Sequence, residues 1–123
     1  MKLTFFGSFR SNLSVPAFSK SKNRQMKYGG YVYILTNKNS TVLYTGVTSN
    51  LLKRLEEHKE GKHVNAFTRK YNCNKLVYFE GFNRIEDAIA REKQIKAGSR
   101  LNKEALINLI NADWKDLAEE VEE

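Results

Sequence analysis

The chain has 123 residues, which is enough for one domain with a modest hydrophobic core. It carries 21 lysines and arginines against 14 acidic residues, and the resulting formal charge of +7 favours a polyanionic partner. The single cysteine, Cys73, excludes a disulfide framework and a cysteine-based zinc site. No apolar run approaches the length that crosses a membrane, so the reducing cytoplasm is the expected compartment.

Residues 1–28 are basic, with a charge of +6, and show no helical or strand period. They are rich in serine and lack the apolar core of a secretory signal, so we expect a disordered extension. The alternative is a basic arm that touches phosphate. The folded domain is expected at residues 29–98, with a charge of +5. Residues 99–123, with a charge of −4, are expected to form helices that pack on the same domain.

The first folded element is predicted to be a β-hairpin. Residues 31–36 and 41–47 are rich in aromatic and β-branched side chains, and turn-forming residues separate them. With residues 38–39 at the tip, Tyr33 would lie directly opposite Tyr44. Both phenols would then emerge on the same face of the sheet.

A helix is expected directly after the hairpin. Ser49 or Asn50 can cap its start, and three leucines give it an apolar stripe. Arg54 and His58 are four residues apart and are therefore neighbours on one helix face. Two tyrosines, an arginine and a histidine would then converge from three consecutive elements. The alternative is ordinary packing by the tyrosines, with Arg54 and His58 facing solvent.

A later helix over residues 85–96, capped by Asn83 and ended by Gly98, carries one charge on its apolar face. Glu92 lies on this face, whose apolar members are Ile85, Ala88, Ile89 and Ile95. Because a buried lone carboxylate is costly, Glu92 requires either an ion pair, with Arg54 as the candidate, or a divalent cation. The other charges of this helix, Arg91 among them, are expected at the solvated surface.

The connection over residues 62–74 interleaves basic residues with Phe67 and Tyr71, a pattern that suits phosphates and unstacked bases. The alternative is a short helix that packs both rings inward. The candidate nucleic-acid contacts are Lys53, Lys62, His63, Arg69 and Lys70.

A third strand is predicted at residues 75–82 and a final amphipathic helix at 101–110, whose apolar residues are Leu101, Ala105, Leu106, Leu109 and Ile110. The expected fold is therefore α+β: a three-stranded antiparallel sheet with flanking helices.

In order and spacing, these residues resemble the GIY-YIG nuclease family. The first motif is matched by Tyr31-Val32-Tyr33 and the second by Tyr44-Thr45-Gly46. The family's arginine falls ten positions after the second-motif tyrosine, at Arg54, and a histidine of the homing-endonuclease branch falls at His58. The family's glutamate pattern is matched by Ala88, Glu92, Ile95 and Lys96.

Three positions depart from the family pattern. Tyr31 replaces the first-motif glycine and Thr45 the second-motif isoleucine. Val47 stands where the excision-repair branch carries a lysine. The first two are backbone and packing positions, whereas Val47 favours a resemblance to the small, single-domain bacterial members.

The resemblance implies a metal-dependent DNA endonuclease in repair or recombination, whose catalytic residues are Tyr33, Tyr44, Arg54, His58 and Glu92. Glu92 would hold Mg²⁺ or Mn²⁺, and Arg54 would bind the scissile phosphate. One tyrosine would accept a proton from water, with His58 in a secondary role. With no second recognition domain, cutting is expected to be structure-selective or weakly specific, on branched or nicked DNA for example, and a protein partner is left open. The alternatives are a nucleic-acid-binding module that does not cut, and a structural adaptor.

Overall fold

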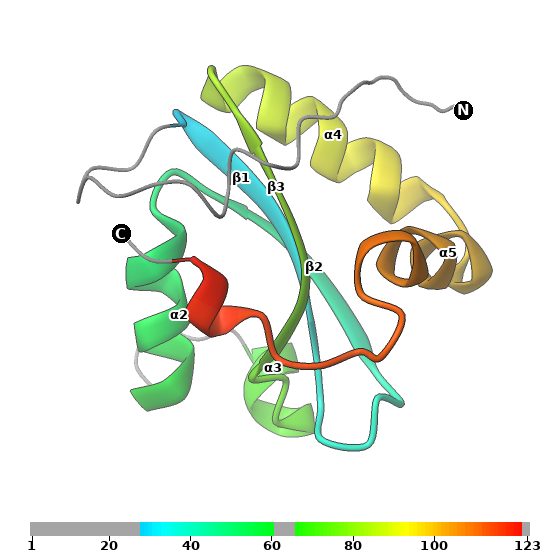
Figure 1. Ribbon diagram of the computed structural model, residues 1–123. Coiled ribbons are helices and arrows are strands. Elements are labelled where there is room, and N and C mark those ends of the chain that lie inside the picture. The colour runs from blue at the N-terminus through cyan, green and yellow to red at the C-terminus, as the bar shows by residue number, and fades with distance from the viewer. Residues whose placement is uncertain (1–27, 61–65, 122–123) are drawn as a thin grey trace.

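The structure, a computed structural model that describes residues 28–60 and 66–121, has the expected α+β fold (Figure 1). Three antiparallel strands form one sheet in the order β2-β1-β3. The strands are β1 (Gly30–Thr36), β2 (Leu43–Thr48) and β3 (Lys75–Phe82). The helices are α2 (Leu51–Glu60), α3 (Ala66–Tyr71), α4 (Ile85–Ala97) and α5 (Arg100–Ile110), and a 3₁₀ turn follows at Ala118–Glu120. Residues 1–27, Lys62 and His63 lie outside the described ranges.

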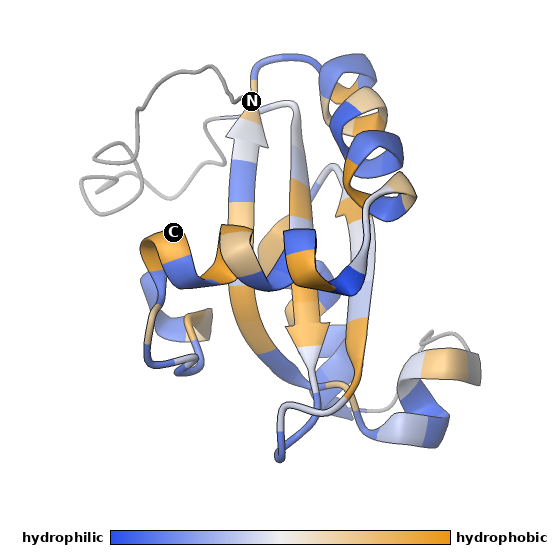
Figure 2. Ribbon diagram, turned by 90° about the vertical axis from the view of Figure 1, so that its right-hand side faces the viewer, coloured by the Kyte–Doolittle hydropathy of each residue, from blue (hydrophilic) through white to orange (hydrophobic). Residues whose placement is uncertain are grey.

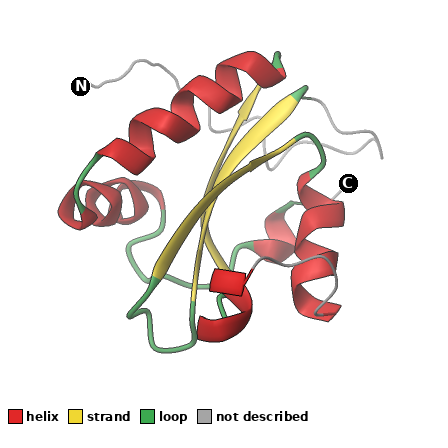
Figure 3. Cartoon of the chain, turned by 180° about the vertical axis from the view of Figure 1, so that it is seen from behind, coloured by secondary structure: helices red, strands yellow, loops and turns green. Residues whose placement is uncertain are grey.

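The central strand β1 is buried along its whole length and separates two cores. Alternate side chains of a strand point to opposite faces. Tyr33 therefore packs on the side of α2, with Leu51 and Leu55, whereas Val32 and Ile34 pack on the side of α4 and α5. Figure 2 shows α5 lying across the sheet, and Figure 3 shows the sheet between α4 and α5 on one side and α2 on the other. Within the described ranges, no helix is both long and apolar enough to cross a bilayer.

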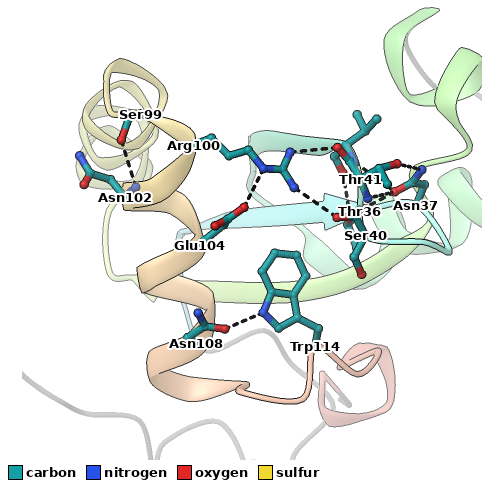
Figure 4. A network of polar contacts seen from close by, with 11 residues as sticks. Thr36, Asn37, Ser40, Thr41, Ser99, Arg100, Asn102, Glu104, Asn108 and Trp114 are labelled. Carbon is teal, nitrogen blue, oxygen red and sulfur yellow. Dashed lines mark hydrogen bonds and ion pairs between the residues drawn. The ribbon is translucent and has the colours of Figure 1, made fainter.

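The hairpin register differs from the prediction by two residues. Tyr33 pairs with Gly46, and Tyr44 pairs with Leu35. The two-residue tip was wrong because side chains build a longer loop between β1 and β2 (Figure 4). The Asn37 side-chain oxygen accepts hydrogen bonds from the backbone N–H groups of residues 41 and 42, at 2.8 and 3.2 Å. Because a shift of two residues preserves the face, Tyr33 and Tyr44 still lie on one side, diagonally rather than directly opposite.

Arg100, the first residue of α5, holds this loop against the helix. Its guanidinium donates hydrogen bonds to the backbone carbonyls of Thr41 and Ser40, at 2.9 and 3.2 Å (Figure 4). Ser40 has a φ of 58°, in the left-handed region, and its N–H bonds to the Asn37 carbonyl at 3.0 Å. The hairpin is therefore fixed by polar contacts that a count of strand-forming residues does not reveal.

Helices α4 and α5 differ in detail from the predictions. Arg84 rather than Asn83 is the N-cap residue of α4. Ile89 is exposed, whereas Arg91 lies partly buried and binds Glu80 of β3 at 3.1 Å. On α5 the predicted stripe was wrong in part: Ile107 is the buried residue and Leu106 is half-buried, while Leu101 and Leu109 are 74% and 80% exposed. The helix has apolar residues on two arcs, and periodicity could not identify which arc faces the sheet.

Thr45 gives a stability test of this packing. It lies opposite Ile34, is buried, and its hydroxyl has no hydrogen-bond partner among the described residues. Because an unsatisfied buried hydroxyl is destabilising, Thr45→Val is expected to raise the free energy of unfolding by about 1 kcal/mol. Thr36 is the matched control: its buried hydroxyl donates to the Val42 carbonyl at 2.7 Å, so Thr36→Val should lower the same quantity. Urea unfolding of the two variants measures both changes, and equal changes would contradict this account.

Candidate active site

Tyr33 lies at the centre of the candidate site and is fully buried. Its cross-strand partner is Gly46, and a Cβ atom at residue 46 would lie 2.5 Å from the Tyr33 hydroxyl oxygen. The missing side chain therefore leaves the space in which the Tyr33 ring lies across β2. No described residue meets hydrogen-bond geometry with the Tyr33 hydroxyl, although the Arg54 side chain lies close enough to act on it. An orphaned buried hydroxyl of this kind indicates a place for a ligand group or water.

Tyr44 and His58 complete a ring cluster with Tyr33. The ring centroids of Tyr33 and Tyr44 are 6.3 Å apart, those of Tyr33 and His58 6.5 Å, and those of Tyr44 and His58 6.4 Å. The three rings come from β1, β2 and α2. The predicted convergence of hairpin tyrosines with the face of the first helix is therefore present in the structure.

Arg54 joins this cluster from α2. Asn50 caps the helix by accepting a hydrogen bond from the Lys53 N–H at 3.1 Å, which settles the choice between Ser49 and Asn50. The Arg54 guanidinium forms an ion pair with Glu57 at 3.3 Å. It is also near enough to the Tyr33 hydroxyl to lower the pKa of that group.

Glu92 approaches the site from α4, which packs on β1 and β2. Its side chain is only 12% exposed, on the same helix face as the buried Ala88 and Ile95. The anticipated ion pair with Arg54 is replaced by a pair with Lys96 at 2.8 Å. Lys96 is 55% exposed, so its ammonium can turn into water while Glu92 stays in place.

The buried surroundings perturb two proton-exchanging groups. Burial raises the pKa of Tyr33 to about 12, the nearby Tyr44 and Glu92 also raise it, and Arg54 opposes them only in part. The chain alone therefore keeps Tyr33 protonated near neutral pH. Burial is also the main cause that lowers the pKa of His58, followed by Arg54, with Glu57 acting in the opposite direction. His58 is therefore neutral at pH 7.

A family model described as the GIY-YIG catalytic domain matches residues 29–105 of this chain. The chain belongs to the GIY-YIG family. A UPF0213 protein of Syntrophus aciditrophicus is 44% identical over 77 residues, which cover 63% of this chain and 87% of that protein. A UPF0213 protein of Clostridium perfringens is 45% identical over 78 residues, which cover 63% and 82%. The solution NMR structure of a UPF0213 protein from Bacillus halodurans aligns with a TM-score of 0.47 and 33% identity, over 71% of this chain and 90% of that one.

GIY-YIG domains are typical of nucleases, which generally use divalent metals. No group of three or more histidine, cysteine or acidic side chains converges within the described ranges. One carboxylate, completed by waters and substrate oxygens, is nevertheless a normal arrangement for Mg²⁺. Glu92 fits it: the carboxylate is nearly buried and lies within electrostatic reach of the orphaned Tyr33 hydroxyl.

Three of the five predicted nucleic-acid contacts lie in the described part of this GIY-YIG domain. Lys53 is exposed on α2, and Arg69 and Lys70 are exposed on α3. Phe67 and Tyr71 are exposed rather than packed inward as the helical alternative expected, and Thr68 of α3 is buried.

Two charged residues of the site were not recognised from the sequence. Glu57 lies three residues after Arg54, and Lys96, quoted above only as part of the glutamate pattern, lies four after Glu92. Both spacings place side chains together on one helix face, so the signal was present once the two helices were recognised.

Proposed function

We propose that this protein is a metal-dependent DNA endonuclease that hydrolyses phosphodiester bonds. The observation that carries the proposal is the nearly buried carboxylate of Glu92, whose charge acts on the Tyr33 hydroxyl, as the charge of Arg54 does from α2. A carboxylate repels phosphate unless a cation intervenes. A site that only bound nucleic acid would gain nothing from burying one there.

Glu92 holds the cation, Mg²⁺ or Mn²⁺, which when bound supplies Lewis-acid stabilisation of the charge that develops on the phosphate. Arg54 binds the non-bridging oxygens of the scissile phosphate, since a guanidinium matches their geometry and stays charged. When the phosphate arrives, it competes with Glu57 for the Arg54 guanidinium, an exchange that the partial exposure of this arginine permits.

His58 accepts the proton of the attacking water, because it is neutral at pH 7 and its ring lies against both site tyrosines. Tyr33 keeps its proton, because its pKa is raised to about 12. It therefore acts as a hydrogen-bond donor that orients the water or the phosphate. Tyr44 is half-buried where Tyr33 is fully buried, so it is the tyrosine that would contact the bound strand. This assignment gives His58 the role of base that either tyrosine was first expected to fill.

The pH dependence of cleavage tests the role of His58. Because the pKa of His58 is lowered from its ordinary value of about 6.5, the rate should rise with pH through an inflection below 6.5 and then level off. His58→Gln is expected to remove the inflection and lower the rate by about 10²-fold or more. Tyr44→Phe, the control, should keep the inflection. Protonated His58 also favours unfolding, so thermal melting at each pH separates inactivation from loss of fold. A rate that rises only above pH 8, with or without His58, would assign the base elsewhere.

A binding module that grips DNA without cutting is the second candidate, supported by the ion pair that Lys96 makes with Glu92 in the protein itself. We propose structure-selective cutting in repair or recombination, because the described residues form one small domain around a single sheet. Cleavage of duplex, nicked, flapped, branched and single-stranded DNA with Mg²⁺, Mn²⁺ or EDTA distinguishes the two candidates. Metal-dependent products support the nuclease, and salt-sensitive binding without products under any metal supports the module.

A further inference from the structure

A row of aromatic rings leads from the site onto the surface of α3. Tyr44 of the site, Phe67 and Tyr71 form this aromatic row. The centroids of Tyr44 and Phe67 are 6.1 Å apart, and those of Phe67 and Tyr71 are 4.9 Å apart. The row is therefore continuous with the ring cluster that contains Tyr33 and His58.

The outer two rings of the aromatic row are open to solvent: Phe67 is 43% and Tyr71 39% exposed. They are held there by the anchoring of α3. Thr68 is buried, and its carbonyl accepts a hydrogen bond from the N–H of the buried Cys73 at 3.0 Å. Since α3 is fixed through Thr68 and Cys73, the rings of Phe67 and Tyr71 are presented outward rather than used in the core.

The charged residues of α3 beside the aromatic row are basic. The α3 sequence, Ala66–Tyr71, contains Arg69 and Lys70 and no acidic residue. The Lys70 ammonium lies over the Tyr71 ring, 5.3 Å from its centroid. Exposed aromatic rings beside basic groups are the arrangement by which proteins stack unpaired bases and hold their phosphates. The exposed Leu101 and Leu109 of α5 have no rings and belong to a helix that covers the other face of the sheet.

We propose that the aromatic row binds the unpaired bases of a single-stranded segment beside the phosphate that is cut. The substrate class is then nucleic acid with a single-stranded stretch, such as a free strand or a flap. In a duplex the faces of the bases are already stacked on one another and are closed to Phe67 and Tyr71. The position of the cut rests on the proposed function, whereas the binding preference does not.

Fluorescence anisotropy in EDTA tests this preference without cleavage. A labelled single strand and the matching duplex are titrated with the parent, Phe67→Leu, Tyr71→Leu and the control Leu109→Ala. The leucine variants retain apolar bulk but lose the ring, and circular dichroism verifies their fold. We expect each to bind the single strand about tenfold more weakly and the duplex nearly unchanged, as loss of one base stack predicts. Leu109→Ala should match the parent, and abasic sites in the strand should reproduce the loss.

Equal weakening of single-strand and duplex binding, or no weakening of either, would overturn this inference. The second result would leave the row for a protein partner. The inference stands if single-strand preference depends on Phe67 and Tyr71 while no metal supports cutting, even though the proposed nuclease activity then fails. Metal-dependent cutting, with single-strand binding that does not depend on either ring, would support the nuclease and overturn the inference about the aromatic row.

Discussion

Replacing Glu92 by glutamine is expected to lower metal-dependent cleavage by about 10³-fold or more, which corresponds to about 4 kcal/mol of barrier. The substitution keeps the size and polarity of the side chain and removes the charge that holds the cation. The fold should survive it, because burying a carboxylate at 12% exposure is costly and the glutamine relieves that cost. Lys96 is exposed and loses only a surface partner. Activity should therefore fall sharply while the free energy of unfolding stays level or rises.

The matched control for Glu92 is Glu86 on the same helix, an exposed residue that pairs with Arg84 at 3.4 Å. Glu86→Gln should retain parental cleavage. The Glu92→Gln protein should also bind DNA as tightly as the parent, or more tightly in EDTA, because the substitution removes one negative charge near the phosphate. Cleavage by Glu92→Gln within tenfold of the parent would remove Glu92 from the metal site.

Replacing Arg54 by alanine is the second large expected effect, a loss of about 10²- to 10³-fold in cleavage. The guanidinium is the group best placed to hold the scissile phosphate, and its loss also frees Glu57 to repel that phosphate. Arg54→Lys should recover only part of the rate, because lysine keeps the charge but not the planar pair of donors. Lys53→Ala, at the preceding exposed position, is the control and should weaken binding slightly without changing the rate at saturating DNA.

Arg54 also offers a spectroscopic readout that is independent of activity. Its charge contributes to the lowered pKa of His58. In Arg54→Ala the pKa of His58 should therefore rise toward its ordinary value, and NMR titration of the imidazole measures this. An unchanged pKa together with full activity would show that Arg54 does not face the site.

The strands and the site cluster were predictable because they depend on local composition and on spacing along single elements. β3 begins and ends at the predicted residues, and the same-face relation of Tyr33 and Tyr44 survived a shifted register because the side-chain period of a strand is two. The register itself was not predictable. It depends on the Asn37 side chain and on Arg100, which lies about sixty residues away in the sequence and holds the loop.

Helix faces were the harder part to predict. On α4 the apolar spacing correctly placed Glu92 at the buried face. Arg91 also lies partly buried, because it forms an ion pair with Glu80 of β3. On α5 two apolar arcs compete, and only the contact with the sheet selects Ile107. The role of Gly46 likewise requires three dimensions, since its missing side chain matters only because the Tyr33 ring lies across it.

A single-turnover cleavage assay distinguishes metal-dependent hydrolysis from binding alone. One labelled DNA, the best substrate of the panel, is mixed with excess parent protein or excess Glu92→Gln, in Mg²⁺ or in EDTA. The proposed nuclease mechanism predicts rapid cleavage by the parent in Mg²⁺, none in EDTA, and at least about 10³-fold slower cleavage by the folded Glu92→Gln. Tight binding of the same DNA by both proteins, with no cleavage by the parent in any divalent metal, would contradict it and identify a phosphate-gripping module instead.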